Sequence, residues 1–275
     1  MHDNARPQRR LVVGFPDFVP TVEAEYPRFF EVSQRVLTAM HGVADREYAA
    51  PEPHQRAILN LSMLAAVSMV EVVTLTANGL SHGAMRIVRS LLETAVNVEY
   101  FRLHPEAFDD YKEWFHVERF RELAFLREHA PEIYAQVDAA AVRDAARHMA
   151  RVRARFLMRD RNGRNRGLRS GWSLLNLDAR AVAAGFSEAY GTINPLASSF
   201  IHETMYGMLK HFVASRDVDR VEVPPTLDWS AQALSGAHHC MVRVVSTLGQ
   251  TFGVEPEPDV AALEREWRYA WTDPR

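Results

Sequence analysis

Polar residues recur at regular intervals in an otherwise apolar segment, residues 81–100, which reads "SHGAMRIVRSLLETAVNVEY". The polar residues are His82, Arg86, Arg89, Glu93 and Asn97. Their spacing of four, three, four and four residues places all of them on one face of an α-helix. Charged and polar groups on one face are typical of a catalytic or ligand-binding site. The same pattern also fits a buried ion-pair network that fixes how two helices pack.

Arg89 and Glu93 form the centre of this polar face. They lie one helical turn apart, so we expect them to pair, because burying a charge without a partner is costly. Glu71 is the only charged residue in the preceding apolar segment, residues 59–80. A helical hairpin that turns in the "NGLSHG" segment brings Glu71 roughly level with Arg86 to Arg89, so Glu71 is a second candidate partner.

A second candidate site is an arginine-rich segment, residues 143–169. It carries ten arginines and two aspartates, a charge of +8 within a chain whose net charge is −3. Clustered arginines bind phosphate groups without reading base sequence, so we expect contact with RNA or a nucleotide. Arg143 and His148 are the candidate binding residues within it. The alternative is a solvated helix face followed by a surface loop.

Helices must position these residues, because apolar residues recur at helical spacing and no convincing strand pattern is present. The sequence predicts an all-α fold, a single bundle of about eight to nine helices. The predicted helices span residues 28–42, 54–77, 82–103, 105–129, 131–157, 178–190, 196–213, 229–252 and 259–271. We expect residues 1–53 to form an N-terminal arm with the first helix, and residues 54–275 to form the bundle domain.

The composition is that of an ordinary folded protein, with 47% hydrophobic and 24% charged residues. The small net charge gives no overall attraction to nucleic acid or membranes. Cys240 is the only cysteine, which excludes an intramolecular disulfide and suits a reducing cytoplasm. The apolar run near the N-terminus ends at Pro16, and no run of about 18 apolar residues follows. We therefore expect a cytoplasmic protein without a membrane partner.

Three stretches follow one another in an order that resembles the bacterial domain of unknown function 5677 family. They read "GAMRIVRSLLETAVNVEYF", "FDDYKEWFHVERFRELAFL" and "GWSLLNLDARAVAAGFSEAYGTINPLASSFIHETMYGM", and the resemblance covers residues 55–215. The matching motif residues are Arg89, Ser90, Glu93, Trp172, Ser173, Tyr190, Ser198 and His202. The family name implies no activity.

More distantly, the Arg-x-x-Leu-Glu helix with a late histidine is similar to the helical HEPN superfamily. That superfamily includes RNase toxins, nucleotide-modifying toxins and inactive binding modules, and its members often pair. The similarity implies an antiparallel helical core, a site organised by Arg89 and Glu93, His202 as a general acid/base, and a homodimer. Active HEPN nucleases carry an arginine, then four to six residues, then the histidine, whereas "NPLASSFI" upstream of His202 contains no arginine.

Two other segments have the arginine–histidine spacing of active HEPN nucleases. They are Arg35 to His41 and Arg143 to His148. Chance produces such pairs readily in a helical chain rich in arginine and histidine, and only the second pair lies in the arginine-rich segment.

A metal site is a further hypothesis, since Glu71, Glu93 and His202 resemble the ligands of di-iron helix bundles. The diagnostic Glu-x-x-His pair is missing, and Arg86 and Arg89 would repel a cation. We therefore expect neither a metal nor another cofactor.

The leading functional interpretation is a HEPN-like bacterial protein that acts on or binds RNA or a nucleotide, in a toxin or phage-defence setting. Arg89, Glu93 and His202 are the candidate catalytic residues in that interpretation. The candidate binding residues are Arg86, Glu71, Asn97, Ser198, Tyr190, Tyr206, Arg143 and His148. Two alternatives stay open: a small-molecule enzyme with a polar or metal-containing pocket in a helical bundle, and a non-catalytic interaction module.

Overall fold

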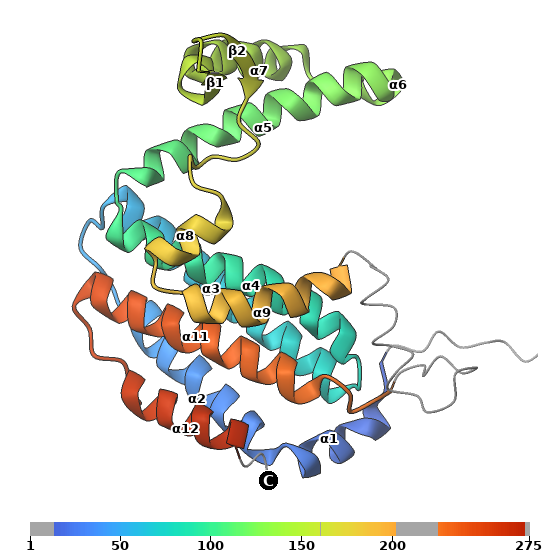
Figure 1. Ribbon diagram of the computed structural model, residues 1–275, viewed down its shortest axis with the longest axis vertical. Coiled ribbons are helices and arrows are strands. Elements are labelled where there is room, and N and C mark those ends of the chain that lie inside the picture. The colour runs from blue at the N-terminus through green and yellow to red at the C-terminus, as the bar shows by residue number, and fades with distance from the viewer. Residues whose placement is uncertain (1–13, 160, 202–224, 273–275) are drawn as a thin grey trace, which may run out of the picture. The chain divides into compact units, whose positions relative to one another are not determined.

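The computed structural model describes residues 14–159, 161–201 and 225–272 (Figure 1). These residues are mostly helical, and the strands among them form one two-stranded sheet. The predicted all-α class is therefore confirmed. Close contacts divide the chain into a first unit, Met1–Glu99 with Gly185–Arg275, and a second unit, Tyr100–Ala184. The division that the sequence predicts at residue 53 stays a prediction.

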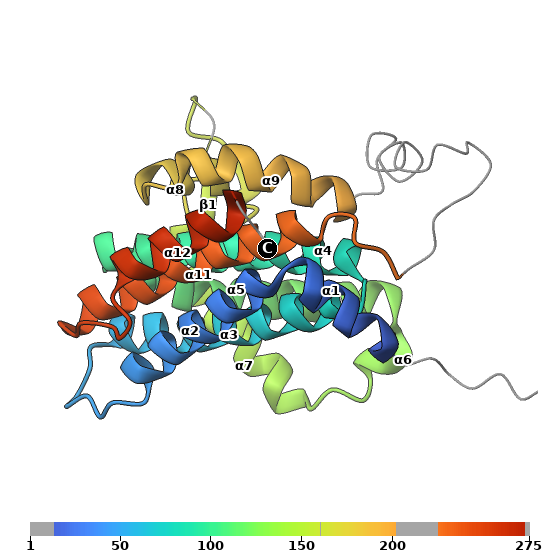
Figure 2. The same cartoon turned by 90° about the horizontal axis from the view of Figure 1, so that it is seen from below.

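The first unit is a layered packing of helices (Figure 2). Its described elements are η1 (Pro16–Phe18), α1 (Val19–Glu25), α2 (Pro27–Ala44), α3 (Pro53–Ala77), most of α4 (Ser81–Leu103), α9 (Ser187–Ile201), α11 (Ser230–Phe252) and α12 (Val260–Thr272). α11 packs against α2, α3 and α12 and is buried along most of its length. Apolar side chains such as Leu234, Met241 and Val245 are removed from water there, which is the main driving force for folding.

The α3–α4 hairpin forms where the sequence predicts it. Pro53 occupies the first turn of α3, where its missing N–H leaves no helical hydrogen bond unmade, and Glu52 and Gln55 form a capping box. Gly79 in the turn has a φ of +68°, which residues with a Cβ rarely adopt. A Cβ at this position would also lie 2.6 Å from the Cβ of Pro225. The turn therefore requires glycine for two reasons.

The second unit is built around α5. Its elements are the end of α4, α5 (Ala107–His129), α6 (Pro131–Tyr134), α7 (Ala139–Val152), η2 (Arg153–Phe156), β1 (Leu157–Arg159), β2 (Asn165–Leu168) and α8 (Leu177–Ala183). The ring centroid of Trp172 lies 5.3 Å from that of Phe101 and 5.4 Å from that of Tyr111. The Arg180 guanidinium lies 4.7 Å from the same ring. Trp172 of the family motif is thus a core residue of this unit.

The prediction of one continuous helix over residues 131–157 is wrong. The chain forms the short α6, and α7 then begins after Asp138, whose carboxylate accepts a hydrogen bond from the Ala140 amide at 2.9 Å. After η2, the strands β1 and β2 pair antiparallel, with Leu157 opposite Leu168. The expectation of no strands therefore fails here, because strands of three and four residues are too short to show alternation.

The predicted helices 178–190 and 196–213 have different limits in the structure. α8 ends at Ala183, and Gly185, with a φ of +71°, separates it from α9. α9 begins at Ser187 and continues through Pro195, which the sequence analysis placed outside both helices. The predicted part beyond residue 201 lies outside the described residues.

Candidate functional site

α4 and α9 pair with opposite chain directions, and polar side chains line their contact. The ring of His82 stacks on Phe200 with centroids 5.4 Å apart. The Nε of Arg86 donates to the Phe200 carbonyl at 2.8 Å, and the Nε of Arg89 donates to the Ser198 Oγ at 3.3 Å. We give the name polar seam to two sets of residues spaced about one turn apart on these helices. They are His82, Arg86, Arg89, Glu93 and Asn97 of α4, and Tyr190, Asn194 and Ser198 of α9.

The expected pair between Arg89 and Glu93 is present. An Arg89 guanidinium nitrogen lies 3.5 Å from the Glu93 Oε2, and the two side chains are 21% and 46% exposed. The pair is therefore reached by solvent, and the interpretation of a fully buried ion-pair network does not fit it. Asn97, two turns beyond Arg89, is buried, and its Oδ1 accepts no hydrogen bond from the described residues.

Ser198 connects Arg89 to a residue that the sequence analysis missed. Its hydroxyl accepts from Arg89 and donates to the Oδ1 of Asn194 at 3.3 Å. The antiparallel register that places Ser198 beside Arg89 also places Asn194 level with Glu93, and Tyr190 one turn further along. Asn194 lies four residues, or one helical turn, before Ser198. In a helix that is continuous through Pro195, this spacing is the sequence signal that places Asn194 on the same face as Ser198.

Three other candidate residues are Glu71, His202 and Tyr206. His202 and Tyr206 lie outside the described residues, so the general acid/base role of His202 stays a prediction. Glu71 is exposed on α3. Within the described ranges, Arg89 contacts Glu93 and Ser198, and an ion pair between Arg89 and Glu71 is absent.

We expect Glu93→Gln to lower the free energy of unfolding by less than about 1 kcal/mol, because a solvent-exposed ion pair contributes little. Urea unfolding measures this change. Glu264→Gln is the matched control, since Glu264 pairs with Arg268 one turn away and is also 46% exposed. A decrease above about 2 kcal/mol in the free energy of unfolding, seen for the Glu93 variant alone, would show that the pair has a structural role.

Seven of the ten arginines in the arginine-rich segment fall into two sets, and the other three are Arg147, which pairs with Asp144, Arg164 and Arg166. In the first set, Arg155 and Arg169 both contact Asp110 of α5, and Arg151 contacts Glu113 of α5 at 2.7 Å. These ion pairs attach α7 and the β1–β2 hairpin to α5. Their arginines therefore have a structural role.

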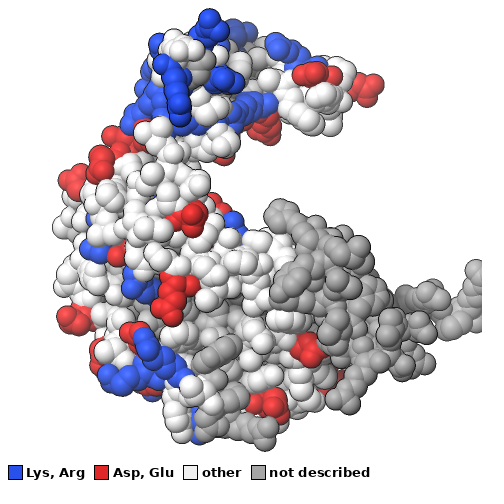
Figure 3. Space-filling view, viewed as in Figure 1, with Lys and Arg blue, Asp and Glu red and all other residues white. Residues whose placement is uncertain are grey.

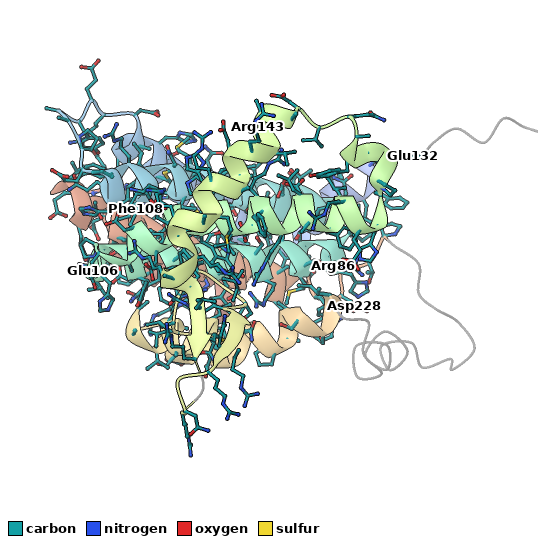
Figure 4. The ribbon with its side chains drawn as sticks, turned by 90° about the horizontal axis from the view of Figure 1, so that it is seen from above. Arg86, Glu106, Phe108, Glu132, Arg143 and Asp228 are labelled. Atoms are coloured by element: carbon teal, nitrogen blue, oxygen red, sulfur yellow. The ribbon has the colours of Figure 1, made fainter. Side chains whose placement is uncertain are left out.

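The second set faces solvent and consists of Arg143, Arg153, Arg159 and Arg161. We call these four side chains the arginine surface. None of them forms an ion pair with a carboxylate in the part of the chain that the structure describes. Lys and Arg side chains gather over the end of the second unit that holds α7 and the hairpin (Figure 3), and Arg143 lies on α7 (Figure 4). This surface can attract an anion.

His148 packs between helices and does not contact Arg143 within the described ranges. Its ring stacks on His116 of α5 with centroids 4.4 Å apart and planes 17° apart. Burial and, secondly, the neighbouring His148 lower the pKa of His116 below its usual value. The spacing that linked Arg143 with His148 thus corresponds to no joint site in the structure.

Metal and thiol chemistry receive no support from the described residues. No three of their His, Cys, Asp and Glu side chains cluster as metal ligands. Burial raises the pKa of Cys240 to about 12. The thiol therefore stays protonated at neutral pH and is no nucleophile.

The fold and the site define an all-α protein with a polar seam between two helices and an arginine-rich β-hairpin. Its family follows from a family model that matches residues 55–219: the chain belongs to the Family of unknown function (DUF5677). This match confirms the resemblance seen over residues 55–215. No curated protein and no solved structure matches the chain.

Proposed function

We propose that the protein binds RNA and that the arginine surface contacts the phosphate backbone. The observation that supports this most strongly is the set of four exposed arginines without a carboxylate partner among the described residues. Exposed arginines without a neighbouring carboxylate can pair with phosphate groups, and that pairing releases the counterions condensed on the nucleic acid. The nearby Asp110 and Glu113 are already engaged by other arginines.

The extent of the arginine surface favours a polymer over a single nucleotide. Arg143 and Arg153 are ten residues apart along α7 and η2, which corresponds to about 15 Å of helical rise. A single phosphate group does not span that distance, whereas successive phosphates of an RNA strand do. Contacts to phosphate alone carry no sequence preference, so we expect binding to many RNA sequences.

The proposal includes chemistry at the polar seam, as in HEPN-like nucleases of toxin or phage-defence systems. Arg89 and Glu93 would orient the RNA. His202 would act as the general acid/base of the cleavage reaction. RNA cleavage by the wild-type chain and by His202→Ala tests this part. Unchanged cleavage in the variant would remove His202 from the mechanism, while loss of cleavage with retained RNA binding would support it.

Charge removal tests the binding proposal. We expect Arg153→Gln, Arg159→Gln and Arg161→Gln together to weaken binding of a labelled single-stranded RNA roughly tenfold or more, because three phosphate contacts are lost. Fluorescence anisotropy measures the affinity. The matched control replaces Arg46, Arg127 and Arg265, which are also exposed, and removes the same charge. An equal loss of RNA affinity in both variants would contradict the proposal that RNA binds at the arginine surface.

The alternative of a small-molecule enzyme is favoured by one observation, the buried Asn97 Oδ1 that accepts no hydrogen bond from the described residues. A ligand donor in the seam would satisfy this oxygen. Under this alternative, Asn97→Ala lowers turnover of a small molecule and leaves RNA affinity unchanged. Loss of RNA cleavage in the Asn97→Ala variant would instead indicate that the polar seam acts on RNA.

A further inference from the structure

α3 presents an apolar face to solvent. Leu64, Val67 and Val70 are 60%, 55% and 49% exposed, although α3 packs its opposite side on α11, α2 and α1. At 100° per residue, these three side chains lie within about one third of the helix circumference. Continuous exposed apolar surface of this kind marks an interaction site more often than chance.

Two charged residues bound the apolar face. Arg56 is exposed in the second turn of α3 and Glu71 is exposed near its end, and both lie on the same face as Val67. Neither forms an ion pair with another side chain in the described ranges. One cation and one anion thus stand about 22 Å apart, at 1.5 Å per residue, with Leu64, Val67, Val70 and the polar Asn60 exposed between them.

We propose that this face binds the α3 face of a second copy of the chain in antiparallel orientation. A two-fold axis passing between Met63 and Leu64 brings Arg56 of each copy opposite Glu71 of the other. An interface with such symmetry uses the same patch twice and must be self-complementary. The α3 face meets that condition, because its two ends carry opposite charges at equal distances from the axis.

The apolar residues of the face then form the centre of the contact. Met63 and Leu64 lie at the two-fold axis, and Val67 lies one turn away on each side, level with the exposed Asn60 of the other copy. An apolar centre with charges at its margin is the usual arrangement of a protein interface. This interface rests on α3 alone and does not depend on RNA binding.

Other occupants of the face are conceivable and are distinguished by experiment. α3 is long and apolar enough to cross a membrane by length and composition, a property that core helices of soluble proteins share. A membrane would have to accommodate the charge of Glu71 within its apolar part. A second copy neutralises that charge with Arg56, so we favour self-association.

Charge exchange within the chain tests the proposal. Sedimentation of the full-length protein over a range of concentrations gives the dimer dissociation constant, and vesicle flotation checks for lipid binding. Arg56→Glu and Glu71→Arg each place like charges opposite each other twice, so we expect each to weaken the dimer roughly tenfold or more. The double variant restores opposite charges, and its dissociation constant should return to within about threefold of the wild type.

A control and three outcomes complete the test. Val182→Glu changes an equally exposed valine on α8 and should leave dimerisation unchanged, whereas Val67→Glu should abolish it. A wild-type chain that stays monomeric overturns the proposal, as does a double variant no better than the single variants. Flotation with vesicles in place of dimerisation would assign the face to a membrane. Circular dichroism confirms that each variant is folded.

Discussion

Asp110→Asn is expected to lower the free energy of unfolding of the second unit by about 2–4 kcal/mol, since two arginines then lose their carboxylate. Arg169 is the more sensitive of the two, because its side chain is only 10% exposed and its guanidinium also donates to the Trp172 carbonyl at 3.3 Å. A charge left buried without its counter-ion is costly. Urea unfolding measures the change when it is followed by tryptophan fluorescence in a chain whose tryptophans at 229, 267 and 271 are replaced by phenylalanine, because Trp114 and Trp172 then report on this unit alone.

Asp144→Asn is the control for this prediction. Asp144 pairs with Arg147 at 3.3 Å, but the two side chains are 57% and 76% exposed. Water screens such a pair, so its loss should cost less than about 0.5 kcal/mol. Equal small effects of both substitutions would show that Asp110 does not hold the hairpin to α5.

His238 should make the stability of the first unit depend on pH. The ring is fully buried in α11, stacks on Phe29 with centroids 5.5 Å apart, and has its Nε2 2.7 Å from the Ser33 Oγ. Burial lowers the pKa of His238 from 6.5 to about 3. Between these two values the unfolded chain binds a proton that the folded protein does not. The stabilising contribution is therefore complete above pH 6.5 and is lost as the pH falls toward 3.

The expected loss between pH 7 and pH 5 is about 2 kcal/mol of unfolding free energy, since each pH unit inside the window is worth about 1.4 kcal/mol. His238→Gln should reduce the difference in unfolding free energy between pH 7 and pH 5 by that amount. This expectation does not depend on how the substitution changes stability at pH 7. His41→Gln is the control, because this ring is half exposed and stays hydrated in both states. An unchanged pH difference in the His238 variant would contradict the prediction.

The sequence predicts those features that depend on neighbours along the chain. Pro53 and Gly79 limit α3 and its turn by local backbone geometry, so both limits were visible. Arg89 and Glu93 are four residues apart on a helix, and the structure confirms their pair. Such features require only helical periodicity and the conformational preferences of proline and glycine.

Features that depend on distant residues were not predictable in the same way. Ser198 contacts Arg89 across 109 positions, and nothing local to either residue identifies the other. The contacts of Asp110 with Arg155 in η2 and with Arg169 after β2 likewise join residues far apart in the sequence. Pro195 indicated a helix break, yet the structure accommodates it within α9, because tertiary packing overrides local preference.

The central claim is that the arginine surface binds RNA through phosphate groups, and the salt dependence of RNA affinity tests it most directly. The logarithm of the wild-type association constant should fall linearly with the logarithm of salt concentration. The variant lacking the arginines at 153, 159 and 161 should show a slope smaller in magnitude by about 2, at roughly 0.7 per phosphate contact on a single strand. Identical slopes for the two proteins, or no measurable RNA binding at low salt, would contradict the account.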